Sequence, residues 1–260
     1  MRYNPEKIIQ EVIQIAQSAG DLIMEVYEMP DFEIENKLDD SPITKADKAS
    51  NNLICKLLTE ITPGCPIISE ENELPEYEVR SKFQQYWLVD PLDGTKEFIN
   101  RNGEFAVNIA LLEENRPVLG VVYLPVYKEM YCAIKGQGAW KIKHNVSNKI
   151  NVSSFKMNDT GLIIAVTRSH FNQQTADFVA HLNFPCIVEK GSAIKMLMIA
   201  EGKAHIHPRF GTTMEWDTAA PQIIVEEAGG EVLQHDQTPV VYNKENLKNP
   251  DFVVFGKLIY

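Results

Sequence analysis

Cysteine is scarce in this chain, and its placement argues against two kinds of site. The 260 residues contain four cysteines, far apart and without a CxxC pair: Cys55, Cys65, Cys132 and Cys186. Disulfide frameworks and the common zinc motifs need closely spaced cysteines, so neither is expected. The four thiols are predicted to be reduced and mostly buried, as is typical of a cytoplasmic protein.

Long apolar runs are also missing. No stretch approaches the length of about 18 apolar residues that marks a candidate membrane helix, so no transmembrane segment is expected. Residues 1–17 lack the apolar core of a secretory signal peptide. The predicted location is the cytoplasm. Association with the cytoplasmic face of a membrane stays open, although no anchor or basic amphipathic helix requires it.

Positive charge is the third shortage. Lysine and arginine number 25 against 36 aspartates and glutamates, which gives a net charge of −11. Nucleic-acid polymers are bound through clustered cations, so such a partner is not expected. A small anionic substrate remains compatible with this composition, because local cations and metal ions can reverse the field inside one pocket.

The first part of the chain predicts helices followed by an antiparallel sheet. With 44% hydrophobic and 23% charged residues, the composition is that of a globular protein. Apolar residues recur at helical spacing after Asn4, a suitable cap, and Pro5, which suits a first helical position. A second helix is predicted over residues 46–61. Residues 105–142 form successive apolar runs separated by turns, which predicts antiparallel strands.

The later part alternates between strand and helix patterns. Strands are predicted over residues 162–166, 186–188 and 205–207, and helices over residues 173–182, 192–201 and 217–228. This alternation is typical of an α/β unit with substantial parallel sheet. The polar stretch 144–149 is the predicted boundary. The fold class is therefore α/β, with an α+β first half (residues 1–145) and an α/β second half (residues 146–260).

The segment Asp90-Pro91-Leu92-Asp93-Gly94-Thr95 predicts a cluster of carboxylates. An apolar strand is expected to end at Asp90, at the edge of a sheet where ligands of α/β proteins gather. A tight turn could aim Asp93 at the same point, Gly94 permits close backbone approach, and a helix could begin at Thr95. A solvated turn is the alternative, because aspartate, proline and glycine are also turn residues.

Two other segments favour the cluster. Glu70 and Glu71 follow the apolar run at residues 67–68, again at a strand end, and Asp217 lies in Glu-Trp-Asp-Thr-Ala-Ala at 215–220. Taken alone, Asp217 is more simply a helix N-cap. Together, several converging carboxylates suit Mg²⁺, which prefers oxygen ligands and often completes its shell with phosphate and water.

These segments, with Pro42-Ile43-Thr44-Lys45-Ala46-Asp47, resemble the inositol monophosphatase superfamily over essentially the whole chain. The resemblance implies a layered αβαβα fold and phosphate-ester hydrolysis with two or three Mg²⁺ ions. It implies that the metal ligands are Glu70, Asp90, the Leu92 carbonyl, Asp93 and Asp217. It also implies that Asp47 and Thr95, beside Glu70, orient or activate the attacking water, and that Li⁺ inhibits.

The second half resembles the 3′(2′),5′-bisphosphate nucleotidase branch of that superfamily. The matching stretches are residues 167–170, 191–195, 200–202 and 207–213, and Lys96-Glu97-Phe98 fits the same branch. The implied reaction converts adenosine 3′,5′-bisphosphate to AMP and phosphate in sulfate assimilation, with the sulfated precursor as a further candidate substrate. The implied substrate contacts are Gly94, Thr95, His170, Ser192, Lys195, Arg209 and Asp217.

Several alternatives stay open on the sequence. Lys195 could lie on a solvated helix face, Arg209 in a surface loop, and His170 could be structural, as is expected of His205 and His207. An inositol monophosphatase or sugar bisphosphatase would use the same metal chemistry, and a noncatalytic phospholigand sensor could share the fold. A monomer is favoured over a homodimer. Pro221 stands where the relatives usually have a small residue. If Asp217 is the N-cap, Pro221 falls near the end of the first turn, where its missing N–H is tolerable.

Overall fold

The first half of the chain builds a seven-stranded sheet in the order β3-β4-β5-β6-β7-β8-β9. The computed structural model describes residues 2–30, 34–36, 42–168 and 172–259. Only β3 and β4 run parallel; the other neighbours are antiparallel. The strands are β3 (Ile67–Ser69), β4 (Gln85–Asp93), β5 (Ala106–Glu113), β6 (Arg116–Leu124), β7 (Glu129–Ile134), β8 (Gly138–Lys143) and β9 (Val146–Ile150). The predicted antiparallel sheet is confirmed, and its last strand lies beyond residue 145.

Helices α1 (Pro5–Tyr27) and α2 (Lys45–Ile61) cover one face of this sheet. Asn4 caps α1 by accepting a hydrogen bond from the Glu6 amide at 2.9 Å, as the sequence predicts. The buried stripes of both helices pack on alternate residues of β5, including Val107 and Ile109. This packing fixes α2, whose first turn carries Asp47, against the sheet that carries Asp90 and Asp93.

The opposite face of the sheet is covered by α6 (Ile194–Ala200) and α7 (Glu215–Glu227). The intervening residues of β5, such as Ala106 and Ala110, point to this side. A Cβ on Gly120 of β6 would lie 2.6 Å from the Ala220 carbonyl, so glycine allows α7 to approach the sheet closely. As a result, the first turn of α7 lies near the strands that carry the acidic residues.

A second sheet of five strands has the order β12-β11-β13-β15-β14. Its strands are β11 (Ile163–Thr167), β12 (Cys186–Lys190), β13 (Ile206–Arg209), β14 (Glu231–Gln234) and β15 (Phe252–Phe255). Strands β12, β11 and β13 are parallel, as predicted. Strands β14 and β15, which the sequence analysis did not identify, are antiparallel to each other, and β15 is antiparallel to β13, so the sheet is mixed.

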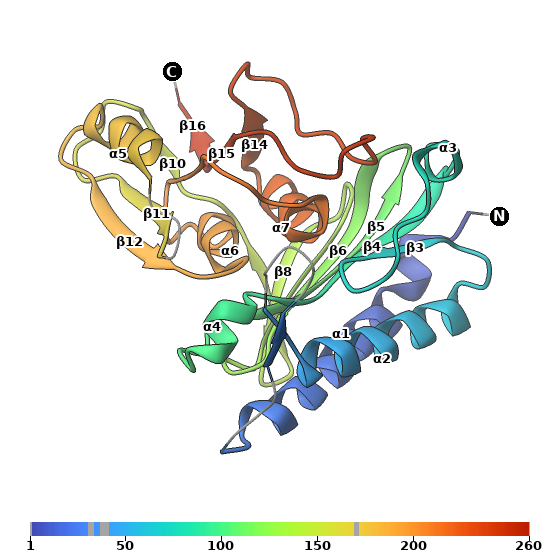
Figure 1. The fold of residues 1–260 in the computed structure, drawn as a ribbon. Coiled ribbons are helices and arrows are strands. Elements are labelled where there is room, and N and C mark those ends of the chain that lie inside the picture. Colours follow the sequence, from blue (N-terminus) through green and yellow to red (C-terminus); the bar gives the residue numbers. More distant parts are fainter. Residues whose placement is uncertain (1, 31–33, 37–41, 169–171, 260) are drawn as a thin grey trace.

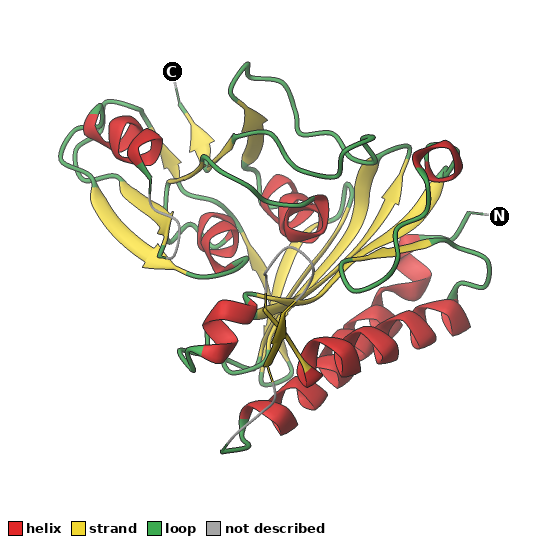
Figure 2. Ribbon diagram, viewed as in Figure 1, coloured by secondary structure: helices red, strands yellow, loops and turns green. Residues whose placement is uncertain are grey.

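Helix α5 (Gln173–Ala180) covers the outer face of the second sheet, and its Val179 packs with Ile164 and Ile206. Figures 1 and 2 show the resulting order of layers: α1 and α2, the large sheet, α6 and α7, the small sheet, and α5. The αβαβα arrangement is therefore confirmed. The shorter elements are β1 (Ile34–Asn36), β2 (Pro42–Thr44), α3 (Tyr77–Arg80), α4 (Thr95–Ile99), β10 (Ser154–Phe155) and β16 (Lys257–Leu258).

All four cysteines are free thiols, but their burial differs from the expectation. Cys132 is buried, Cys55 and Cys65 are partly buried, and Cys186 is exposed because β12 is an edge strand. No helix in the described ranges has both the length and the apolar character needed to cross a membrane.

Candidate active site

Three carboxylates from separate elements converge at one edge of the large sheet. Glu70 directly follows β3, Asp90 lies in β4, and Asp217 lies in the first turn of α7. Strands β3 and β4 are parallel neighbours, so their carboxyl ends meet at the same edge. Oxygen atoms of Glu70, Asp90 and Asp217 all lie within 4.8 Å of one another. The solvated-turn alternative is wrong, because Asp90 is 1% exposed.

Asp93 stands beside these three acids and is held from two sides. The Ala193 amide donates to Asp93 Oδ2 at 2.6 Å, and Asn108 Nδ2 donates to the same atom at 3.3 Å. The sequence predicted that this strand would end at Asp90, which is wrong. Strand β4 continues to Asp93, and its pairing with β5 is irregular between Asp90 and Asp93. The irregularity places Asp90 opposite Asn108 and Asp93 opposite Ala106. We call Glu70, Asp90, Asp93 and Asp217 the acidic cluster.

The charges of the acidic cluster repel one another inside the protein. Burial raises the pKa of Asp90 well above its usual range, and the nearby charges of Glu70, Asp93 and Asp217 raise it further. Burial, together with Asp93 and Glu70, also raises the pKa of Asp217. A divalent cation bound among the carboxylates would relieve this repulsion, and oxygen ligands suit Mg²⁺. The donor set therefore fits a metal.

Two polar atoms near the acidic cluster support the same conclusion. Asn108 Oδ1 and Ser192 Oγ are buried and have no hydrogen-bond partner within the described part of the chain. Buried polar atoms are normally hydrogen-bonded. Asn108 is bonded to Asp93 through its other side-chain atom, and Ser192 lines the pocket described below. Both atoms are thus available to bound water or substrate.

Asp47, in the first turn of α2, and Thr95, the first residue of α4, form the predicted hydrogen-bonded pair. Thr95 Oγ1 donates to Asp47 Oδ1 at 3.1 Å and lies 3.3 Å from the Leu92 carbonyl oxygen. The other Asp47 oxygen accepts from the Thr44 amide at 2.7 Å and the Thr44 hydroxyl at 2.6 Å. Burial raises the pKa of Asp47, and these hydrogen bonds oppose the rise. The pair connects α2 to the backbone that carries Leu92.

Helix α4 begins at Thr95, as predicted, and Gly94 precedes it in the left-handed region with φ +93°. A Cβ at Gly94 would lie 3.1 Å from both the Glu104 carbonyl oxygen and Ser192 Cβ. Gly94 therefore allows the two halves of the chain to approach at the site, in addition to supplying the turn.

A cavity of about 320 Å³ joins the acidic cluster to the second half. It brings together most of the predicted site residues, namely Glu70, Asp90, Leu92, Asp93, Gly94, Thr95, Ser192, Lys195, Arg209 and Asp217. His170 lies outside the described residues. The cavity thus joins the acidic cluster, including Asp217 of the second half, to the cations Lys195 and Arg209, and Lys96 of the first half also lines it.

Lys195 and Arg209 are the cations that the second half contributes to the pocket, and Lys96 of the first half also lines it. Lys195 is 7% exposed, so the solvated-face alternative is wrong; burial lowers its pKa to about 8. Its Nζ donates to the Ser192 carbonyl at 2.6 Å. Arg209 ends β13 and donates to the Thr212 carbonyl at 2.7 Å. The rings of His205 and His207 pack on aromatic side chains, as predicted, and His207 also lines the cavity.

Comparison with known proteins agrees with this geometry. The family model described as the inositol monophosphatase family matches residues 4–251. The chain belongs to the inositol monophosphatase family. A 3′(2′),5′-bisphosphate nucleotidase CysQ from Salmonella typhimurium is 44% identical, over 95% of this chain and 99% of that protein. The crystal structure of CysQ from Bacteroides thetaiotaomicron matches with a TM-score of 0.86 and 40% identity, covering 98% of each chain.

A more distant member of the fold was solved with metal. An IMPase/NADP phosphatase complexed with Mg²⁺ and phosphate has a TM-score of 0.77 and 21% identity, over 97% of this chain and 90% of that one. At this identity the likeness shows the fold alone.

Helix α7 of this inositol monophosphatase family member begins earlier than the sequence predicts. Its first residue is Glu215, its cap is Met214, and Asp217 accepts a hydrogen bond from the Met214 amide at 2.9 Å. The N-cap interpretation of Asp217 is therefore wrong. Pro221 consequently lies inside the helix, where it cannot donate to the Asp217 carbonyl.

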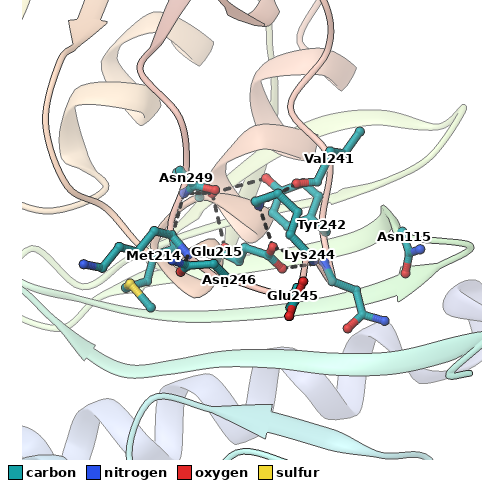
Figure 3. Close-up of polar contacts among 12 residues, drawn as sticks. Asn115, Met214, Glu215, Val241, Tyr242, Lys244, Glu245, Asn246 and Asn249 are labelled. Carbon is teal, nitrogen blue, oxygen red and sulfur yellow. Dashed lines mark hydrogen bonds and ion pairs between the residues drawn. The ribbon is translucent and has the colours of Figure 1, made fainter. Parts of the chain in front are cut away.

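A network of polar contacts fixes the start of α7 from the far side (Figure 3). Glu215 is fully buried and accepts hydrogen bonds from the Asn243 amide at 2.6 Å and from Lys244 Nζ at 2.5 Å. Asn249 Nδ2 donates to the Met214 carbonyl at 2.7 Å. These contacts hold the turn that presents Asp217.

Sequence reasoning missed Asn108, Thr167, Thr212 and Thr213 as site residues. Asn108 lies next to the acidic cluster only because β5 pairs with β4 in one register, which periodicity does not reveal. Thr212 and Thr213 line the cavity next to Arg209, in a stretch already noted for its resemblance. Their position beside Glu215-Trp216-Asp217 was the available signal.

Proposed function

We propose that the protein is a Mg²⁺-dependent 3′(2′),5′-bisphosphate nucleotidase that converts adenosine 3′,5′-bisphosphate to AMP and phosphate. The main observation behind this proposal is that one cavity contains both the acidic cluster and the cations Lys195 and Arg209. A metal-dependent phosphomonoesterase needs a carboxylate site such as the acidic cluster. A substrate with a second phosphate also needs cations to pair with that phosphate. The name of the Salmonella relative, which the chain matches along nearly its whole length, supports this substrate.

The acidic cluster, to which the second half contributes Asp217, would hold the metal, and Asp47 and Thr95 of the first half would orient the water. Glu70, Asp90, Asp93, Asp217 and the Leu92 carbonyl would provide oxygen ligands, and we propose two or three Mg²⁺ ions. When bound, Mg²⁺ supplies activated water and stabilises the departing oxygen.

Thr95 donates to Asp47, so the threonine oxygen can accept a hydrogen bond from the attacking water and orient it. Water oxygen then bonds to phosphorus in line with the ester bond that breaks, and the departing ribose oxygen takes a proton.

The residues of the second half would bind the rest of the nucleotide. Lys195 and Arg209 would pair with the second phosphate, and the buried Ser192 hydroxyl would bond to phosphate or sugar. His170 is proposed as a further contact on sequence resemblance. The sulfated precursor of this nucleotide carries the same two phosphate positions and is a second candidate substrate, which would place the enzyme in sulfate assimilation.

On the sequence resemblance, we propose a monomer as the active unit. The division into a metal-binding part (1–145) and a second part (146–260) that contributes substrate contacts and one metal ligand, Asp217, is likewise a proposal, supported by the lining of the cavity.

Phosphate release from adenosine 3′,5′-bisphosphate and from inositol 1-phosphate, at equal concentration with Mg²⁺, tests the proposal. We expect a strong preference for the nucleotide, which should shrink in Lys195→Met because the second phosphate loses a partner. A preference for the inositol ester would keep the metal site and reject the assigned substrate. Binding of the nucleotide with Mg²⁺ but without phosphate release would indicate a sensor instead.

A further inference from the structure

Glu104 belongs to the first half of the chain, and its buried carboxylate binds residues of the second half. It lies just before β5 and is 4% exposed. Its Oε2 accepts from the Gly191 amide at 2.8 Å, and its Oε1 accepts from Lys190 Nζ at 2.7 Å. Arg168 adds an ion pair at 2.9 Å. All three partners belong to the second half, next to the cavity.

The electrostatics of Glu104 are those of a fully paired acid. Burial alone would raise the pKa of Glu104, but the bonds from Lys190 and the Gly191 amide hold the pKa below its usual range. Glu104 is therefore ionised in the folded protein. Its charge is also felt at Lys195, where it favours the protonated form.

The partners of Glu104 form a tight corner between β12 and α6, made of residues 190–193. A Cβ at Gly191 would lie 2.6 Å from Glu97 Cγ and 3.0 Å from the Glu104 carbonyl oxygen, so only glycine fits without a shift. Ser192 follows with φ +47°, which is strained for a side chain. Such a conformation persists only when surrounding contacts hold it.

This corner supplies both sides of the active site. The Ala193 amide donates to Asp93 Oδ2 at 2.6 Å, which orients a proposed metal ligand. Ser192 and Lys195 face the cavity on the substrate side. A displacement of the corner would therefore disturb the metal side and the substrate side together.

We propose that Glu104 is a positioning residue that fixes the 190–193 corner, so that Ala193 orients Asp93 while Ser192 and Lys195 meet the substrate. Glu104 itself lies outside the cavity lining and acts through Gly191. The part that concerns the nucleotide rests on the proposed function, whereas the part that concerns Asp93 requires only phosphate-ester hydrolysis.

Four variants test this role with two substrates, adenosine 3′,5′-bisphosphate and p-nitrophenyl phosphate, at saturating Mg²⁺. Glu104→Ala removes every acceptor, whereas Glu104→Gln keeps one for the Gly191 amide. Gly191→Ala disturbs the corner while keeping the Glu104 side chain, because its Cβ would lie 2.6 Å from Glu97 Cγ and 3.0 Å from the Glu104 backbone carbonyl. Glu201→Ala is the matched control, because Glu201 also accepts from a residue of the first half, Tyr131 at 2.6 Å, but lies outside the cavity lining.

In Glu104→Ala and Gly191→Ala we expect kcat to fall for both substrates and KM to rise for the nucleotide only. The loss in kcat/KM for the nucleotide should be about tenfold to hundredfold, as misplacement of a site by about 1 Å commonly costs. Glu104→Gln should recover part of it. Glu201→Ala should lower the melting temperature and leave both constants within about twofold of wild type.

The proposal is overturned if Glu104→Gln and Gly191→Ala keep wild-type kcat and KM, whatever their stability. These two variants decide the matter even if Glu104→Ala does not fold. A wild-type protein that hydrolyses p-nitrophenyl phosphate but ignores the nucleotide would reject the proposed function instead. The kcat effect on p-nitrophenyl phosphate would then still test the positioning of Asp93.

Discussion

Two groups of buried or partly buried carboxylates in this protein have opposite electrostatics. In the acidic cluster, burial and like charges raise the pKa values of Asp90 and Asp217. In a second group, which we call the lysine-bridged cluster, Lys141 lies 2.7 Å from Glu129 and 3.0 Å from Glu201. Burial would raise the pKa of Glu129, but hydrogen bonds from Lys141, Lys143 and Tyr131 lower it to about 2.

The opposite pKa shifts indicate that the acidic cluster serves ligand binding, whereas the lysine-bridged cluster serves stability. The lysine-bridged cluster is complete without any ligand, and it links β7 and β8 to the end of α6. The acidic cluster is incomplete without a cation, so its repulsion costs folding energy that metal binding recovers. Substitutions should therefore act in opposite directions at the two places.

The largest expected effect is on turnover. Asp93→Asn should lower phosphate release at least about hundredfold, because a ligand charge is lost with little change in shape. The melting temperature of the metal-free protein should stay equal to that of wild type or rise. Glu201→Gln is the control, with near-normal turnover and a lower melting temperature. Near-normal turnover in Asp93→Asn would contradict its assignment as a ligand.

Mg²⁺ should raise the melting temperature through the acidic cluster. At about 100 times the dissociation constant, a ligand of the folded state adds about 2.7 kcal/mol of stability. For a chain of this size that corresponds to roughly 5–10 °C. Thermal unfolding with EDTA and with increasing Mg²⁺ measures it. The shift should be small in Asp90→Asn and intact in Glu129→Gln; an intact shift in both would place the metal elsewhere.

The pH dependence of stability should differ in sign between the clusters. In EDTA near pH 7, Asp90→Asn should be more stable than wild type, because burial and the neighbouring carboxylates disfavour the ionised form of Asp90 in the folded protein. This advantage should begin to shrink once the pH falls below the raised pKa of folded Asp90, and it should vanish near the free-chain aspartate pKa of about 3.9, where Asp90 becomes neutral in the unfolded chain as well.

Glu129→Gln should be less stable than wild type near pH 7. The deficit should disappear as the pH falls from about 4.5 towards 2, since the free-chain pKa of glutamate is about 4.3 and that of Glu129 is about 2. Urea unfolding between about pH 2 and pH 7 compares each variant with wild type. Parallel pH profiles for the two variants would contradict the distinction between the clusters.

The sequence predicted the parts of the site that lie next to one another in the chain. Asp90 and Asp93 are three residues apart, and the strand before them was clear from its apolar run. Glu70 and Asp217 could be added because each sits at a strand end or helix start, and the resemblance linked them. Helix positions in the second half were also predicted to within a few residues.

Contacts set by pairing between distant segments could not be predicted. Asn108 joins the acidic cluster through strand register, and Glu104 meets Gly191 only after both halves are packed. The start of α7 was misplaced because Asp217 is a good N-cap type, whereas the contacts of Glu215 with residues 243–244 extend the helix by two residues. Local preference lost to tertiary packing there.

The smallest expected effect on turnover concerns Glu215, which shares one electrostatic feature with each cluster. Burial raises the pKa of Glu215, and Lys244 and two backbone amides oppose the rise, so the acid is paired yet adjacent to the turn of Asp217. Lys244→Met should lower stability by about 1–3 kcal/mol, the cost of leaving a buried charge short of a partner. Because the Met214 amide still bonds to Asp217, kcat should fall by less than about fivefold.

Lys248→Met, a change at an exposed lysine, is the control for stability and kinetics. Equal stability in the two variants would show that Lys244 does not support Glu215, whereas a loss of kcat comparable to that of Asp93→Asn would make Glu215 part of the metal site.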